Sequence, residues 1–328
     1  MIEEFRRDAL SAFDGLPICV FAWDGDEETP RPDLPADVEA YAWRVGVGEY
    51  GDSNMADIFP LFLEHVDTTR IRALLLSAWD GDVSGEDVDK LQAILLESAD
   101  RFPALEALFV SDIPSEMSEV SWIEQCDPAA LIAAFPRLRV LGLRGGIAGP
   151  FEPLDHAGIE ELVMQSGGLA PRVVRAVSAS NLPALTSLDL YLGIREYGGG
   201  ATVADLDGIL SGAAFPTLRH LGLRDAENTD ELAAALAHAP VVAQLESLNL
   251  SLGTLGDEGA AALLAGQPLT HLKQLDLHHH FLSDAMMDRL RQALPGVELD
   301  LAEQEKPESW GHTQDGDSEL FRYVAVSE

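Results

Sequence analysis

Basic residues are scarce in this sequence, and lysine is almost missing. The 328 residues include 21 Lys and Arg against 56 Asp and Glu, so the formal net charge is −35, and the lysines are Lys90, Lys273 and Lys306. Binding to nucleic acid phosphates or to an anionic membrane surface depends on clusters of positive side chains. The composition therefore argues against nucleic acid and against membranes as partners.

Long apolar runs and paired cysteines are lacking as well. No stretch approaches the roughly 18 apolar residues of a membrane-spanning helix. Glu3 and Glu4 stand where a signal peptide carries only basic residues. Two cysteines, Cys19 and Cys126, cannot build a disulfide framework. We therefore expect a folded cytoplasmic protein, since 47% of the residues are hydrophobic and 23% are charged.

The dominant pattern is the motif L-x-x-L-x-L, which recurs along most of the chain. The first positions of successive motifs are 21 to 34 residues apart, and their mean spacing of about 29 residues is typical of leucine-rich repeats. Side chains alternate along a strand, so the fourth and sixth positions share one buried face. A single repeat cannot bury that face, whereas stacked repeats share a continuous core. The motifs begin at Ile71, Leu105, Leu138, Ile159, Leu185, Leu218, Leu245 and Leu272.

Helix signals fill the segments between these motifs. Thr202 and Asp205 form a capping box, and Asp127-Pro128 places a cap before a proline at the first helical position. Prolines two residues before a motif then end the helices. These prolines are Pro103, Pro136, Pro183 and Pro216. The pattern predicts an α/β leucine-rich-repeat solenoid, a horseshoe with a parallel β-sheet on its concave face and helices on its convex face.

The two ends of the chain depart from the repeat and predict three regions. We expect residues 1–37 to form an N-terminal cap, because an end repeat would otherwise expose its core. Residues 38–301 then form the solenoid, with about eight clear repeats after a degenerate first one. Residues 302–328 are expected to form an acidic C-terminal tail or cap.

The segment Leu245–Leu264 combines the leucine motif, a loop, Gly-Asp-Glu-Gly-Ala and a helix, and so resembles the ribonuclease-inhibitor type of leucine-rich repeat. That type carries Asn or Cys at the ninth position, whereas this chain has glycine there in several repeats, which predicts a tighter turn. The stretches 66–70, 121–125 and 255–272 resemble an uncharacterised family of cytosolic leucine-rich-repeat proteins of actinobacterial type. That resemblance implies a bacterial protein. Its association with genes for radical-SAM and ATP-grasp-type proteins implies an alternative role as an accessory protein of a peptide-modification pathway.

Three motifs leave a metal- or nucleotide-binding enzyme open as a further alternative. Gly46–Gly51 matches the dinucleotide fingerprint G-x-G-x-x-G but has acids where the pyrophosphate would lie. Asp80–Ser84 resembles the start of a calcium loop that lacks its closing glutamate. His278–His280 with Asp276 offers two outward zinc ligands and no evident third. We expect no catalytic residues, no cofactor and no enzyme activity.

The fifth and seventh positions of each motif point away from the shared core and predict the binding surface. In the N-terminal half this surface is apolar, with Leu75, Phe109 and Val163. Further along it is polar, and Tyr and Arg are residue types that dominate interface energetics. A charge of −35 favours a basic protein or peptide partner, so the sequence predicts a non-catalytic protein-interaction scaffold. The expected partner-binding residues are Arg144, Gln165, Asp189, Tyr191, Arg224, Asn249, Ser251, Asp276 and His278.

Overall fold

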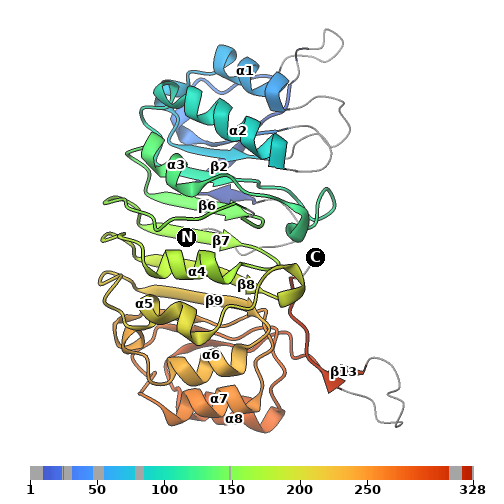
Figure 1. The fold of residues 1–328 in the computed structure, drawn as a ribbon, viewed down its shortest axis with the longest axis vertical. Helices are drawn as coiled ribbons and strands as arrows, with labels where there is room; N and C mark the ends of the chain where they lie inside the picture. Colours follow the sequence, from blue (N-terminus) through green and yellow to red (C-terminus); the bar gives the residue numbers. More distant parts are fainter. Residues whose placement is uncertain are drawn as a thin grey trace. The chain divides into compact units, whose positions relative to one another are not determined.

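The computed structural model describes residues 10–23, 25, 32–46, 55–77, 85–147, 149–309 and 320–326. The chain forms two compact units. Met1–Gln165 together with Ser180–Leu185 is called the N-terminal unit, and Ser166–Ala179 together with Thr186–Ser327 is called the C-terminal unit. Each consists of the alternating strands and helices of a leucine-rich-repeat solenoid (Figure 1).

The sheet of the N-terminal unit is parallel except at its first strand. β1 and β2 form an antiparallel hairpin, and β2 through β7 then pair in parallel in chain order. The fourth positions of the motifs are aligned, with Leu74 opposite Leu108 and Leu108 opposite Leu141. The strands are β1 (Ala12–Phe13), β2 (Leu16–Phe21), β3 (Ala42–Val45), β4 (Ala73–Leu76), β5 (Ala107–Val110), β6 (Val140–Arg144) and β7 (Glu161–Gln165), and the helices are α1 (Met55–His65), α2 (Gly85–Glu97) and α3 (Pro128–Ala134).

The C-terminal unit repeats this arrangement with β8 through β12 paired in parallel. A short antiparallel pair, β13 and β14, lies outside that sheet. The strands are β8 (Ser187–Gly193), β9 (His220–Ala226), β10 (Ser247–Asn249), β11 (Gln274–Asp276), β12 (Glu298–Asp300), β13 (Glu308–Ser309) and β14 (Leu320–Phe321). The helices are α4 (Pro171–Ser178), α5 (Asp207–Leu210), α6 (Thr229–Leu236), α7 (Asp257–Ala265) and α8 (Asp284–Ala293).

The predicted strands and helix starts are confirmed, because a strand lies at each of the eight motifs. The Asp127 side chain accepts a hydrogen bond from the Ala129 amide at 3.0 Å and caps α3. The capping box of Thr202 and Asp205 is present, but it opens a 3₁₀ turn, which is followed by the very short helix α5.

In each unit the core lies between the strands and the helices that cover one face of the sheet (Figure 1). Side chains at the fourth position of the motif, such as Leu74, Leu108, Leu248 and Leu275, are completely buried. Burial of one such leucine contributes about 2 kcal/mol, so the repeated motif itself supplies much of the stability of both units.

Glycine at the ninth position permits a close approach between neighbouring turns. Gly193 has a φ of +63°, and a β-carbon on it would collide with the carbonyl oxygen of Gly167. Ile194 donates its amide to that same oxygen at 2.9 Å. The predicted tighter turn is therefore present here, and only glycine fits it.

Residues near each end of the chain pack against the repeats of the unit to which they belong. Strand β2, within the region expected to be a cap, pairs in parallel with β3, while Phe13 of β1 turns back over the sheet. The segment Arg322–Val326, called the C-terminal segment below, lies against the loops after β9, β10 and β11. Within the described ranges, no helix has the length and apolar character that a membrane span requires.

The N-terminal unit contains both cysteines of the chain. Cys19 lies in β2 and is half-buried, whereas Cys126 is buried beside α3. Burial raises the pKa of the Cys19 thiol, and it raises that of the Cys126 thiol to about 12. Both shifts run opposite to the lowered pKa of nucleophilic cysteines.

Candidate functional site

The sheet face that carries the fifth and seventh motif positions, called the fifth-position face below, is covered in the N-terminal unit. Leu75 and Phe109 are completely buried there against Leu10 and Phe13. The rings of Phe13 and Phe109 meet edge to face, with their centroids 6.0 Å apart. The apolar half of the predicted binding surface is thus a second small core under the N-terminal residues.

Two predicted partner-binding residues of this unit, Arg144 and Gln165, are buried too. The Arg144 guanidinium donates to Gln165 Oε1 at 2.9 Å and to the Ile113 carbonyl at 2.8 Å. It also lies 5.5 Å from the centroid of the Phe109 ring and 3.7 Å from an oxygen of Asp112. Arg144 and Gln165 are therefore parts of the interior and are not accessible to a partner in this structure.

Tyr191, Arg224 and Ser251 of the C-terminal unit are likewise buried, although they lie together as predicted. The Arg224 guanidinium lies 4.8 Å from the centroid of the Tyr191 ring and donates to Ser251 Oγ at 3.0 Å. It also pairs with Asp189 at 3.4 Å. This arrangement holds Asp189 in place at the edge of the exposed part of the face, where its side chain keeps 22% exposure.

A row of polar residues crosses neighbouring strands of the fifth-position face. Asp300 is exposed and Asn249 half-buried, whereas Asp276 and His278, both predicted to bind a partner, are buried. Asn249, Asp276 and Asp300 are directly opposite one another in the register of β10, β11 and β12. Asn249 donates to one oxygen of Asp276 at 2.9 Å, and His278 Nδ1 lies 2.7 Å from the other. Burial raises the pKa of Asp276, but the hydrogen bond and charge of His278 outweigh it, so the pKa is lowered.

This row contains the one group of potential metal ligands found among the described residues. Donor atoms of Asp276, His278 and Asp300 all lie within 4.8 Å of one another. His279 and His280 do not join them, because their rings contact the carbonyl oxygens of Tyr323 and Leu301 instead. The histidine triplet therefore does not form one cluster. A third potential ligand, which the spacing of the motif did not reveal, is Asp300.

The two other motifs considered for cofactors fall on residues that the structure does not describe. The dinucleotide-like glycines lie outside the described residues apart from Gly46, and the calcium-like stretch 80–84 lies outside them completely. Both therefore stay predictions from the sequence.

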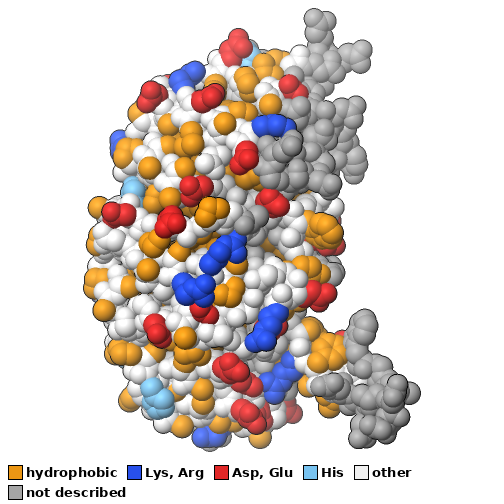
Figure 2. All heavy atoms as spheres, viewed as in Figure 1, with side chains coloured by type: hydrophobic (Ala, Val, Ile, Leu, Met, Phe, Trp, Pro, Cys, Tyr) orange, Lys and Arg blue, Asp and Glu red, His pale blue; other side chains and the backbone are white. Residues whose placement is uncertain are grey.

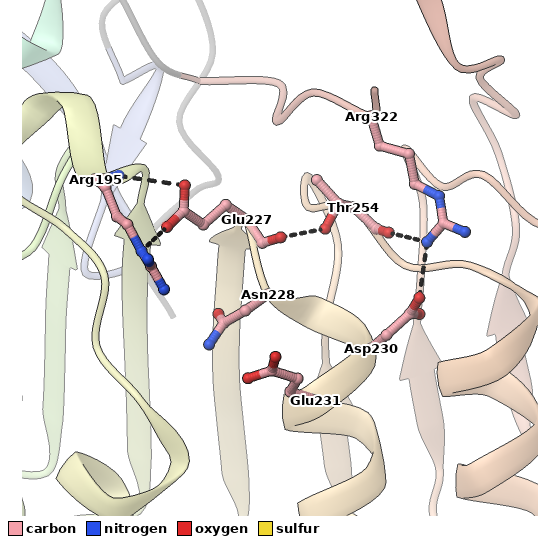
Figure 3. Close-up of a pocket in the computed structure, with 7 residues that line it drawn as sticks. All are labelled: Arg195, Glu227, Asn228, Asp230, Glu231, Thr254 and Arg322. Atoms are coloured by element: carbon pink, nitrogen blue, oxygen red, sulfur yellow. Dashed lines mark hydrogen bonds and ion pairs between the residues drawn. The ribbon is translucent and has the colours of Figure 1, made fainter. Parts of the chain in front are cut away.

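A pocket of about 580 Å³ opens at the loops that follow the strands of the C-terminal unit. Figure 3 shows that an arginine and a carboxylate are paired on each side of it. On one side Arg195 pairs with Glu227 at 2.8 Å, and on the other Arg322 pairs with Asp230 at 2.7 Å. The residues that line this loop-edge pocket are Arg195, Glu227, Asn228, Asp230, Glu231, Thr254 and Arg322.

The turns around the loop-edge pocket are fixed by hydrogen bonds between successive repeats. Thr254 donates its hydroxyl to the Glu227 carbonyl at 2.8 Å, and its amide is held by Thr229 at 3.0 Å. One oxygen of Asp230 accepts the amide of Gly256 at 2.7 Å and that of Gly259 at 3.1 Å. The pocket is therefore preorganised, which lowers the entropic cost of binding.

Between the two ion pairs lie Asn228 and Glu231 (Figure 3). Glu231 is exposed, and within the described residues its carboxylate has no hydrogen-bond or ion-pair partner. Three carboxylates and two guanidinium groups leave the pocket with one excess negative charge. The surrounding surface is mixed, since basic side chains gather over α4 and the adjoining part of this unit (Figure 2).

This pocket was not predicted from the sequence. Its acidic residues follow strand β9 closely, with Glu227 in the connecting turn and Asp230 and Glu231 in the first turn of α6. That offset from the motif was a usable signal. Arg322 has no such signal, because it comes from the C-terminal segment, 92 residues after its partner Asp230.

No protein-family model and no curated protein matches this chain. Among solved structures it is similar to a Bacteroides fragilis protein from a structural genomics consortium, with 28% identity over 80% of this chain and 76% of that one, and a TM-score of 0.72. It is also similar to an internalin from Listeria monocytogenes, with 17% identity over 82% of this chain and 63% of that one, and a TM-score of 0.39. The likeness to the Bacteroides fragilis protein concerns the fold, so the function rests on the site.

Proposed function

We propose that the protein is a non-catalytic interaction scaffold whose loop-edge pocket binds a basic side chain of a protein partner. The observation that supports this most is Glu231, an exposed carboxylate without a partner among the described residues, between two ion pairs that are already satisfied. A lysine or arginine that enters the pocket would pair with Glu231. Arg195 and Arg322 would not compete for Glu231, because each is already paired with another carboxylate.

The exposed carboxylates of the fifth-position face add to the same preference. They are the partly exposed Asp189 and the exposed Asp300 of the C-terminal unit. With a formal charge of −35 on the whole chain, association with a basic partner is accelerated at low ionic strength. We place this scaffold in the cytoplasm of a bacterium, and the ribonuclease-inhibitor type of repeat makes a basic enzyme a reasonable partner.

Affinity capture from a native lysate at low salt tests the proposal. The wild-type chain is compared with Glu231→Gln, which removes the charge and keeps the shape. Glu258→Gln is the matched control, since it removes an exposed carboxylate from the first turn of the next helix, α7.

We expect a basic protein to be retained by the wild type and by Glu258→Gln and to be lost with Glu231→Gln. Retention should also weaken steeply as salt rises above the physiological range. Equal retention by all three chains would contradict the assignment of the pocket, and retention of neutral or acidic proteins alone would contradict the basic partner.

A further inference from the structure

The C-terminal segment occupies the strand-end loops of the C-terminal unit in the manner of a bound peptide. Arg322 donates to Asp230 at 2.7 Å and to the Thr254 carbonyl at 3.0 Å. Ala325 donates its amide to the Leu252 carbonyl at 2.8 Å. These contacts join residues that are 68 to 92 positions apart, and the spacing of the repeat does not account for them.

The side chains of the segment alternate between buried and exposed, as in an extended peptide. Val324 and Val326 are each 7% exposed, and Ala325 between them is exposed. Tyr323 packs edge to face on Phe281, with ring centroids 5.4 Å apart. Backbone hydrogen bonds combined with pockets for alternate side chains are how extended peptides are commonly recognised.

The C-terminal segment covers the carboxylate of Asp225 but forms a hydrogen bond with only one of its two oxygens. One carboxylate oxygen accepts the Val326 amide at 2.9 Å, and the other is buried with no hydrogen-bond partner among the described residues. Burial raises the pKa of Asp225 well above its usual range, against the smaller effects of the Val326 amide and Arg224. A buried carboxylate left half-satisfied is costly, so the docked segment is held less tightly than its contacts alone suggest.

We propose that these loops form a peptide-binding groove, which the C-terminal segment occupies in cis. Its partner is an extended peptide with the pattern arginine, aromatic residue, valine, small residue, valine. The inference rests on the proposed scaffold function and names the segment of the partner that the C-terminal unit takes. Arginine would pair with Asp230, and the two valines would fill the sites of Val324 and Val326.

A labelled peptide with the sequence of residues 320–326 (LFRYVAV) tests the groove by fluorescence anisotropy. The full-length chain is compared with the double variant Arg322→Ala, Val326→Pro, which removes the ion pair and the amide that reaches Asp225. Ala325→Ser is the control, because it changes an exposed side chain and keeps the backbone donor. The single variant Arg322→Ala serves if the double variant does not unfold cooperatively.

We expect the peptide to bind the double variant at least about tenfold more tightly than it binds the wild type or Ala325→Ser. A peptide with glutamate in place of its arginine should bind none of them. No binding to any cooperatively folded variant, or equal binding to all chains, would overturn the groove. Dimers of the wild type that the peptide dissociates would assign the groove to a second copy and overturn occupation in cis. Glu231 makes no hydrogen bond or ion pair with the described residues of the segment, so the capture experiment with Glu231→Gln tests the proposed function separately from the groove.

Discussion

Two buried aspartates, one in each unit, occupy the eighth position of their repeats and are neutralised in different ways. Asp112 accepts the Leu10 amide at 3.2 Å and pairs with Arg44, whose Nε lies 2.8 Å from it. Asp225 accepts the Val326 amide, and within the described residues no side chain pairs with its carboxylate. The same position in the repeat therefore contacts a terminal segment in both units, but within the described residues an arginine pairs with the carboxylate only in the N-terminal unit.

This difference teaches where a repeat protein keeps its adaptable surface. In the N-terminal unit the terminal residues bury aromatic rings and complete a salt bridge, so they belong to the core. In the C-terminal unit the terminal segment covers an imperfectly satisfied carboxylate and borders an open pocket. Function is thus best placed in the C-terminal unit.

The largest expected effect comes from breaking the pair in the N-terminal unit. Arg44→Ala leaves the completely buried Asp112 carboxylate without its closest cation, which should cost about 3–5 kcal/mol of unfolding free energy. Denaturant unfolding followed by circular dichroism measures it. A loss under about 1 kcal/mol would show that Asp112 does not depend on Arg44.

The apolar anchors of the two terminal segments give the next contrast. Phe13→Ala should cost about 3 kcal/mol, because the ring is buried against Phe109. Val326→Ala removes about two buried methylene equivalents and should cost about 1.5 kcal/mol. Thermal unfolding of both variants compares them, and equal losses would erase the proposed distinction between a core segment and an exchangeable one.

Replacement of each buried aspartate by asparagine should affect the stability of the two units differently. Asp225→Asn keeps the acceptor for Val326 and removes a poorly satisfied buried charge, so stability should stay within about 1 kcal/mol of the wild type or rise. Asp112→Asn should lose most of what Arg44→Ala loses. Comparable destabilisation by both substitutions in urea titrations would contradict the comparison.

The smallest expected effect is a pH dependence of the unfolding free energy, caused by Asp225. Because the folded pKa of Asp225 is raised, the folded state binds its proton more readily than the unfolded state. Stability from this group is present below the ordinary pKa of aspartate and is lost as pH rises toward the folded pKa. The difference in unfolding free energy between the wild type and Asp225→Asn, measured from pH 4 to 8, should therefore shift against the wild type as pH rises. A difference that stays constant across this pH range would contradict a contribution of Asp225 to the pH dependence of stability.

The elements of the fold were predictable because their signals are local. The leucine motif places strands with a period of two, and caps and prolines mark where helices begin and end. The predicted register holds, as Leu248 lies opposite both Leu221 and Leu275. Only the lengths failed, as in the brief helix α5.

The candidate site was less predictable, because accessibility depends on contacts between distant residues. Arg144 and Tyr191 were expected to be exposed from strand alternation alone, and both are buried. The Leu10 and Asp112 pair spans 102 residues and the Val326 and Asp225 pair spans 101, separations to which no periodicity points. Terminal segments that return over a sheet leave no signal in the repeat itself.

The distribution of cysteine has a practical consequence. Both thiols lie in the N-terminal unit, and Cys126 is buried with its pKa raised to about 12. An alkylating reagent can modify Cys126 only when that unit opens, whereas half-buried Cys19 needs far less motion. The rate of Cys126 labelling under native conditions therefore reports the opening free energy of the N-terminal unit within the intact, unmutated chain. The C-terminal unit contains no cysteine and does not contribute to the labelling.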